Sequence, residues 1–469
     1  MRAAVAAGHP ATVDAGIEVL EEGGNAADAA VAASLASCVA ETVMTGLLGG
    51  GHAIVLRDGE VSTLDFFVAV PGLGSEPRVL ELEHLEVPFG TELVHYAVGI
   101  GSCGVPGVLA GLGELWRRDG SLPWARLVEP ALRLAREGSE FPPAHAACLE
   151  MLAPVMTMRE GRRIYRRDGR LLAEGERLEQ PGLVPALEAI AEEGSRSPTV
   201  ESALLALMEE RGGLVTREDL ETYRAFWGEP GRVERSGFEF ASRIGLSSPL
   251  SLYRSVTGSD PVRLAKALAA PERDGDTTNL TVVDAAGDAV VLTTSLGLGS
   301  GDWLPGFDLH LNSMLGEADL LVGELVPGRR MASMMAPTLV SDREGLVLAL
   351  GAAGGTRLRS ALVQVAVGVL DDGLSPRDAV DRRRLHPAAG VVHLEPGFPD
   401  DVPEALGAAG FTVRHWPSRH HYFGGVSAVT RSGAAGDPRR SGSARHPARS
   451  ASAREPSRRT RTPDNRDSR

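Results

Sequence analysis

The chain has 469 residues, 43 % of them hydrophobic, which is enough for two or three domains or for one large unit with a sizeable core. Its 62 acidic and 48 basic residues give a net charge of −14, which argues against a nucleic-acid-binding surface on the main body. Three widely spaced cysteines without a CxxC pair exclude a disulfide framework and a zinc ribbon, and we expect neither a metal nor a cofactor.

The first half of the chain alternates short strands with helices. The apolar run at 1–10 is too short for a signal peptide, and its residues 3–7 predict a strand. Gly23-Gly24 ends one helical pattern, and Asn25 caps the next. The predicted strands of this half also include 52–57 and 61–67. The predicted helices cover 12–22, 26–39, 106–118, 126–137, 182–194 and 200–211.

The second half changes character at residue 277. Residues 228–276 mix Gly, Pro, Ser and Arg, and they predict a connecting region with one short helix near 261–269. Beyond them the pattern predicts a long helix at 357–371 and strands at 279–284, 289–295, 345–350, 391–394 and 423–430. Residues 441–469 predict a disordered basic tail, because 439–469 hold ten arginines against three acidic residues, a net charge of +7.

The predicted hairpin at 279–295 begins beside an Asp-Thr-Thr sequence. Cleavage before Thr277 would give a threonine with a hydroxyl and a free α-amine, which together form a nucleophile and its base. A turn centred on residue 286 makes partner residues sum to 572, so Val283 faces Ala289 and Thr277 faces Ser295. A hydroxyl at Ser295 could polarise that of Thr277, although Thr and Ser also suit the end of an exposed strand.

A glycine-rich turn lies between the predicted strand at 345–350 and the helix at 357–371. Gly354 and Gly355 in this turn would point backbone N–H groups into open space at the positive end of the helix. Such donors suit a tetrahedral oxyanion or a phosphate. The chain has no GxxxxGK[ST], GxSxG or HExxH motif, which argues against a nucleotide-binding protein, a serine hydrolase and a zincin.

Several blocks in order resemble the γ-glutamyltransferase (γ-glutamyltranspeptidase) family of N-terminal-nucleophile hydrolases. The resemblance spans about residues 3–440, and its combined order is far more specific than any single block. The blocks include Gly23-Gly24-Asn25-Ala26-Ala27-Asp28, Gly49-Gly50-Gly51, Val105-Pro106-Gly107, Asp276-Thr277-Thr278-Asn279, Pro327-Gly328-Arg329-Arg330-Met331 and Gly354-Gly355-Thr356-Arg357.

The resemblance implies an α+β fold of the four-layer αββα type and a precursor that cleaves itself between Asp276 and Thr277. It divides the chain into a large-subunit segment, 1–276, and a small-subunit segment, 277–440, which precede the tail. The two fragments would stay together as a heterodimer. Membrane contact is not expected, and as written the protein is cytoplasmic, unless a start codon assigned too far downstream hides an export signal.

The same resemblance assigns roles to individual residues. Thr277 would attack a γ-glutamyl amide such as glutathione and pass the acyl group to water or an amine. Gly354 and Gly355 would form the oxyanion hole, and Ser295 stands where the family has a threonine. Glu317 matches an acidic position that receives the α-amine of the substrate.

The chain departs from the family at the substrate's α-carboxylate. The family holds this group with an arginine and two adjacent serines, but Phe67 stands at the arginine position, and Met334 replaces the second serine beside Ser333. Gly297 stands where many members have an asparagine. This departure leaves open an acylase for acyl groups without an α-carboxylate. The region 228–276, which is shorter than in the family, and the basic tail leave open a catalytically degenerate binding protein.

Overall fold

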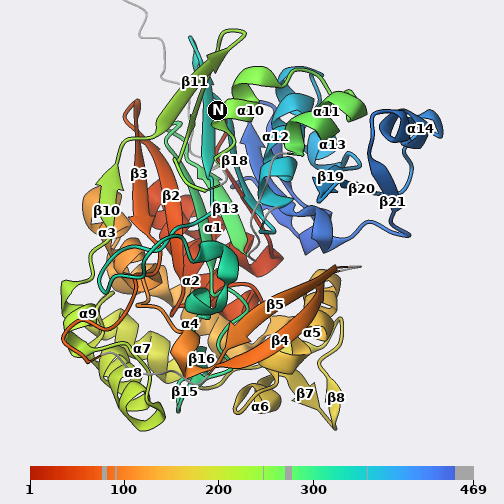
Figure 1. Ribbon diagram of the computed structural model, residues 1–469. Helices are drawn as coiled ribbons and strands as arrows, with labels where there is room; N and C mark the ends of the chain where they lie inside the picture. Colours follow the sequence, from red (N-terminus) through yellow and green to blue (C-terminus); the bar gives the residue numbers. More distant parts are fainter. Residues whose placement is uncertain (77–81, 90–91, 247, 270–276, 356, 449–469) are drawn as a thin grey trace, which may run out of the picture.

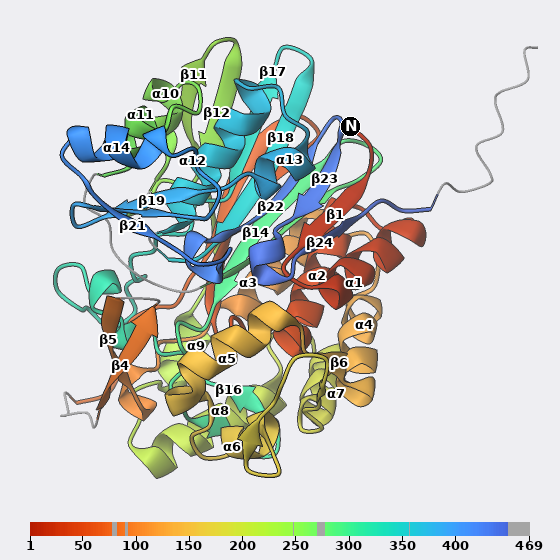
Figure 2. The same ribbon diagram turned by 90° about the vertical axis from the view of Figure 1, so that its right-hand side faces the viewer.

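The computed structural model describes residues 1–76, 82–89, 92–246, 248–269, 277–355 and 357–448, and these form a mixed arrangement of helices and sheets (Figures 1 and 2). Thr277 is described, whereas Asp276, on the other side of the predicted cleavage position, lies outside these residues. Within the described residues, none of the helices combines the length and the apolar character needed to span a bilayer.

A seven-stranded antiparallel sheet carries the candidate nucleophile at one end of a central strand. Its order is β10-β3-β2-β14-β13-β1-β24. The strands are β1 (Ala4–Ala7), β2 (Gly50–Arg57), β3 (Glu60–Phe66), β10 (Phe226–Gly228), β13 (Thr278–Val283), β14 (Ala289–Ser295) and β24 (Ser443–Arg445). The β13–β14 hairpin is thus inserted between β1 and β2, which both come from the part of the chain before Thr277.

A six-stranded antiparallel sheet packs on the first one, in the order β11-β12-β17-β18-β22-β23. Its strands are β11 (Gly231–Arg235), β12 (Phe238–Ser242), β17 (Thr338–Asp342), β18 (Gly345–Ala353), β22 (Gly425–Thr430) and β23 (Gly433–Gly436). Small and branched apolar side chains from both sheets, such as Ala6, Val291 and Ala349, form one buried cluster between them. Each sheet therefore buries one face against the other.

Helices cover the outer faces of both sheets (Figures 1 and 2). The seven-stranded sheet is covered by α1 (Pro10–Glu21), α2 (Ala26–Ala40) and α3 (Val108–Asp119), with α4 (Trp124–Glu137), α7 (Leu183–Glu193) and α8 (Pro198–Arg211) behind them. The six-stranded sheet is covered by α10 (Leu250–Ser255), α12 (Arg357–Leu370) and α13 (Pro376–Asp381). Every residue of α2 is buried, and its alanines permit this close packing.

Smaller elements complete the described chain. A three-stranded sheet of β19 (Leu385–Ala388), β20 (Val391–Leu394) and β21 (Thr412–His415) packs beside α11 (Pro261–Leu268) and α14 (Asp401–Ala408). The hairpin β4 (Glu83–Phe89) and β5 (Glu92–Val98) lies near α5 (Pro143–Met156), in the lower half of Figure 1.

The structure corrects two expectations about irregular segments. Residues 228–242 are not a plain connection: β11 and β12 pair as a hairpin around Ser236 and Gly237, whose φ angles are 53° and 82°. A Ser-Gly dipeptide between alternating apolar residues was the available signal. Residues 443–445 of the expected tail form β24, which pairs with β1, because the exposed edge of β1 offers unpaired backbone groups.

The predicted hairpin register is confirmed. Val283 pairs with Ala289 and Thr278 with Thr294, so every partner sum is 572 as expected. The strand predicted at 345–350 continues as β18 to Ala353, so the glycine turn is shorter than expected. This extension brings Gly354 to the start of the hairpin.

Candidate active site

A cavity lined by buried residues lies where the start of β13, the end of β14 and the glycine turn meet. Eleven residues from segments far apart in the sequence line it: Phe67, Thr277, Ser295, Met314, Glu317, Leu320, Ser333, Met334, Met335, Gly355 and Leu358. Every described residue that the sequence predicted for the site is in this set, except Gly354, which contacts Thr277 directly.

Thr277 lies one residue before β13, and its hydroxyl faces the glycine turn. The Gly354 N–H donates a hydrogen bond of 3.0 Å to the Thr277 Oγ. The φ angles of Gly354 and Gly355 are +124° and +57°, and a Cβ added to Gly354 would lie 2.8 Å from the Gly424 Cα. Glycine is therefore required here, and the turn presents backbone donors at the head of α12 to the reacting oxygen.

Ser295 ends β14 and lies in the same cavity as Thr277. Its Oγ accepts a hydrogen bond of 2.8 Å from the Gly297 N–H. A Cβ added to Gly49 would lie 2.1 Å from the Ser295 carbonyl oxygen, so the glycine run at 49–51 permits close backbone approach at this point. The hydroxyls predicted to gather at this end of the hairpin do so.

The opposite side of the cavity is apolar. Phe67, Met314, Leu320, Met334 and Met335 belong to one buried cluster that lines this side. Met314, Met334 and Met335 line the cavity, whereas Met331 belongs to the same cluster without lining it. None of the eleven lining residues that the structure describes is a lysine or an arginine.

Glu317 is the one charged side chain among the eleven lining residues. It is buried, and a Cβ added to Gly297 would lie 2.4 Å from its Oε1. The glycine at the position where the family has an asparagine thus leaves the room that this carboxylate occupies. An acidic side chain in the lining suits an ammonium group better than a second carboxylate.

Behind Phe67 lies a partly buried charged cluster that sequence reasoning missed. Asp65 is 3.0 Å from the Arg330 Nε, 3.8 Å from the Arg243 Nη2 and 3.6 Å from the His52 Nδ1. Burial raises the pKa of the Asp65 carboxyl and lowers the pKa of Arg243. The Phe67 ring stacks on His52 with centroids 5.5 Å apart, and so it stands between this cluster and the cavity.

Glu41, also missed, lies on the other side of β13 at the end of α2. Its Oε1 accepts from the Thr12 hydroxyl at 2.6 Å, and its Oε2 accepts from the Thr278 hydroxyl at 2.5 Å. Burial raises the pKa of Glu41 to about 7. No motif or spacing pointed to this residue, because a single glutamate after an alanine-rich helix resembles an ordinary helix end.

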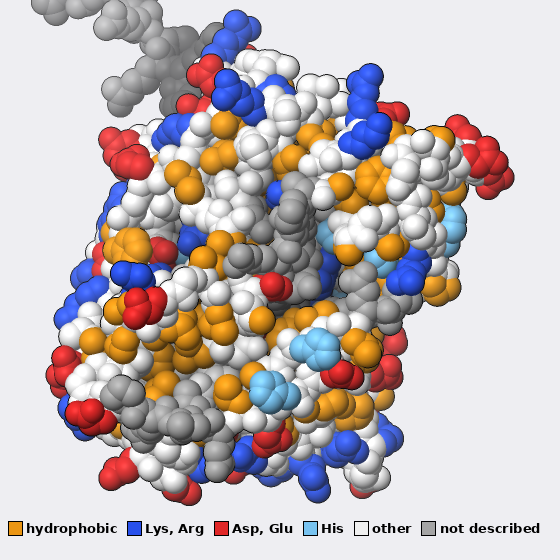
Figure 3. Space-filling model, viewed as in Figure 1, with side chains coloured by type: hydrophobic (Ala, Val, Ile, Leu, Met, Phe, Trp, Pro, Cys, Tyr) orange, Lys and Arg blue, Asp and Glu red, His pale blue; other side chains and the backbone are white. Residues whose placement is uncertain are grey.

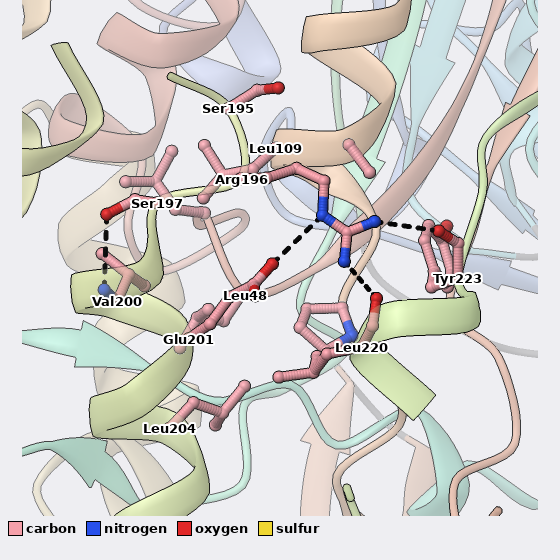
Figure 4. A pocket seen from close by; sticks show the side chains of 13 residues that line it. Leu48, Leu109, Ser195, Arg196, Ser197, Val200, Glu201, Leu204, Leu220 and Tyr223 are labelled. Atoms are coloured by element: carbon pink, nitrogen blue, oxygen red, sulfur yellow. Dashed lines mark hydrogen bonds and ion pairs between the residues drawn. The ribbon is translucent and has the colours of Figure 1, made fainter. Parts of the chain in front are cut away.

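A second cavity, of about 50 Å³, lies between α3, α8 and α9 (Arg217–Thr222) (Figure 4). Its arginine, Arg196, donates to the backbone carbonyls of Leu220 and Tyr223 and pairs with Glu201. These contacts use the guanidinium for structure. Among the described residues, this cavity and the cavity of Thr277 share no lining residue. The visible face of the molecule carries charges of both signs along its rim (Figure 3).

Comparison with known proteins decides the family. A family model described as Gamma-glutamyltranspeptidase matches residues 12–250 and 249–446. The chain belongs to the γ-glutamyltranspeptidase family. It is therefore an enzyme of the N-terminal-nucleophile hydrolase class.

Relatives of this family member carry two kinds of name. The "Acylase ACY 1 proenzyme" of Pseudomonas sp. (strain V22) is 29 % identical, over 91 % of this chain and 89 % of the relative. The "Glutathione hydrolase proenzyme" of Escherichia coli (strain K12) is 27 % identical, over 87 % and 86 %. The crystal structure of cephalosporin acylase from Bacillus halodurans has a TM-score of 0.79 at 22 % identity and covers 95 % of both chains, which shows a shared fold.

Proposed function

We propose that this protein is a self-processing N-terminal-threonine amide hydrolase with the αββα fold of its class. The observation that carries the proposal is the 3.0 Å hydrogen bond from the Gly354 N–H to the Thr277 Oγ at the head of α12. A hydroxyl held against backbone donors of a glycine turn, with Ser295 in the same cavity, suits attack on an acyl carbon.

In the self-cleavage step, the Thr277 Oγ attacks the carbonyl carbon of Asp276. The C–N bond breaks, a C–O ester bond forms, and the hydroxyl proton ends on the released nitrogen. Water then hydrolyses the ester, which frees the Asp276 carboxyl and regenerates the hydroxyl. The products are the segments 1–276 and 277–469, which would remain associated as one enzyme.

In turnover, the free α-amine of Thr277 takes the hydroxyl proton as the oxygen attacks the substrate amide. The N–H groups of Gly354 and Gly355 stabilise the oxyanion, each with about 3–4 kcal/mol at the transition state. The proton passes to the leaving amine as the C–N bond breaks. Water, or an acceptor amine, then releases the acyl group from the threonine ester.

For the substrate, we propose an aliphatic acyl group without an α-carboxylate. The acyl side of the cavity is built from Phe67, Met334 and their apolar neighbours, and its one charged lining residue is the acidic Glu317. A substrate carboxylate there would be desolvated against apolar side chains and would face the carboxylate of Glu317, which costs several kcal/mol. An amine on the acyl group would instead meet Glu317.

A γ-glutamyl amide such as glutathione is the second candidate. Glu317 and Ser333, two of the positions with which the family holds the glutamyl group, are retained and line the cavity. Names of both kinds, acylase and glutathione hydrolase, occur among relatives of similar identity. The two candidates differ in one chemical group, the α-carboxylate.

Three p-nitroanilides separate the candidates. The γ-glutamyl compound carries an amine and a carboxylate, the 4-aminobutyryl compound lacks only the carboxylate, and the butyryl compound lacks both. We expect kcat/KM for the 4-aminobutyryl compound to exceed that for the γ-glutamyl compound. The reverse order would select the second candidate, and a wild-type chain that neither cleaves itself nor hydrolyses any of the three would overturn the proposed function.

A further inference from the structure

Glu41 and Thr45, four residues apart in the chain, each form a hydrogen bond with one strand of the β13–β14 hairpin. At the end of α2, the Glu41 carboxylate accepts from Thr278 of β13. Four residues later, the Thr45 hydroxyl donates a hydrogen bond of 2.8 Å to the Thr294 Oγ of β14. Thr278 and Thr294 are cross-strand partners and form the pair of the hairpin nearest Thr277. Residues 41–45 therefore contact both members of this pair.

The Glu41 carboxylate also contacts α1. Its second oxygen accepts the Thr12 hydroxyl, and Gly8 comes so close that an added Cβ would lie 2.5 Å from the Glu41 Oε2. An ionised carboxylate accepts from both hydroxyls at once, whereas a protonated one must donate from one oxygen. Protonation therefore reverses or breaks one of the two hydrogen bonds.

The surroundings of Glu41 hold few other charges. Arg440 of η5 (Pro438–Arg440) favours its ionised form, and the Cys38 thiol lies one turn back on α2, with its pKa raised to about 12 by burial. Arg440 also reaches the glycine turn, since a Cβ added to Gly354 would lie 3.4 Å from its Nη2. On α1 and β13, Thr12 and Thr278 face Glu41 with hydroxyls.

We propose that ionised Glu41 is a positioning residue for Thr277, which it holds in register for attack through Thr278. The carboxylate touches neither the substrate nor the reacting atoms, so its effect passes through the backbone between two adjacent residues. This inference rests on the proposed function. It adds that self-cleavage and turnover both need Glu41 in its charged form.

Self-cleavage isolates this effect, because Thr277 has no free amine before the bond is cut. The precursor is made by cell-free synthesis, moved to buffers from pH 5.5 to 9, and followed on denaturing gels. We expect the rate to rise about tenfold through a midpoint near pH 7, the pKa that burial gives Glu41. The buried histidines His9, His145 and His421 have pKa values below 6.5, because burial lowers them.

Glu41→Gln keeps the shape and removes the charge. We expect its self-cleavage to be about tenfold slower at pH 8 and independent of pH between 6 and 8.5. Thr278→Val should show the same loss, whereas Thr278→Ser, which retains the hydroxyl, should restore most of the rate. A Glu41→Gln profile that still titrates near pH 7 at the wild-type rate would overturn the inference while leaving the proposed function intact.

Thermal unfolding separates positioning from a folding defect. The folded-state pKa of Glu41 is raised, so its contribution to stability is full below the unfolded pKa and is lost as pH rises through about 7. At pH 8 the neutral glutamine avoids the cost of a buried charge, and its Tm should equal or exceed that of the wild type. If Glu41→Gln fails to fold, the self-cleavage rates of Thr278→Ser and Thr278→Val are compared instead. Equal rates for these two variants would contradict the inference.

Discussion

The two ends of the cavity differ in the groups that line them. At the Thr277 end, the Gly354 N–H, Ser295 and the glycine run at 49–51 are backbone groups and short side chains fixed by strand register. At the acyl end, the large side chains project from less regular segments: Phe67 directly follows β3, Met314 begins a 3-10 helix, and Met334 and Met335 lie in a loop. Reaction type therefore depends on the sheet geometry, whereas substrate choice depends on a few exchangeable side chains.

The strongest test of the Thr277 end is Thr277→Ala. Without the hydroxyl, both self-cleavage and turnover should fall by at least about 10⁴-fold, because no other group can form the ester. A denaturing gel should show two bands for the wild type and one for the variant, and Thr277→Ser should retain partial cleavage. Two bands from Thr277→Ala would place the scissile bond elsewhere.

A substitution in the glycine turn tests the donors. Gly354→Ala forces a side chain onto Gly424 at a φ of +124°, and this displaces the N–H that faces Thr277. We expect kcat to fall about 10²–10³-fold. Gly390→Ala is the matched control, because Gly390 also has a positive φ, 82°, but an added Cβ meets no atom within 4 Å. Equal activity losses in the two variants would show that strain, and not donor position, is responsible.

Glu317→Gln tests the one charge at the acyl end. It should lower kcat/KM for the 4-aminobutyryl anilide about tenfold, since the ammonium loses a buried carboxylate partner. The butyryl anilide carries no amine, so its hydrolysis should change by less than about threefold. Similar losses on both anilides would mean that Glu317 supports the fold of the cavity and does not select the substrate.

Met334→Ser should have the smallest effect. It restores a second serine beside Ser333, and the added hydroxyl can donate to a carboxylate that the apolar wall cannot hold. The ratio of γ-glutamyl to 4-aminobutyryl turnover should rise a few-fold, with little change on the butyryl anilide. Met334→Leu keeps the wall apolar and serves as the control. An unchanged ratio in both variants would move the specificity determinant to Phe67.

The Thr277 end could be predicted from sequence because it depends on local periodicity. The partner sum of 572 follows from the position of one turn, and that sum predicts Ser295 beside Thr277. The glycine turn follows from a strand, two glycines and a helix in succession. Both features lie within single hairpins or strand-to-helix connections, where register propagates residue by residue.

The rest of the site depends on contacts between distant segments. Arg243 and Arg330 meet Asp65 across more than 170 residues of chain, and Glu41 meets Thr278 across 237. No local pattern marks such residues, since their significance arises only when two sheets and their helices pack together. The β11–β12 hairpin was missed for a different reason: β12 alternates apolar and polar residues, but β11 holds a single apolar side chain, Val233, and so gives no strand pattern of its own.

The position of the β13–β14 hairpin also bears on how the protein acquires its shape. Strands from before and after Thr277 interleave in both sheets: β13 and β14 lie between β1 and β2, and β12 pairs with β17. A chain cut before Thr277 would hold its two pieces by ladder hydrogen bonds on several strands. Once unfolded, those pieces would have to find each other again at dilute concentration. The enzyme would therefore fold as the uncut precursor, and unfolding after cleavage would be irreversible.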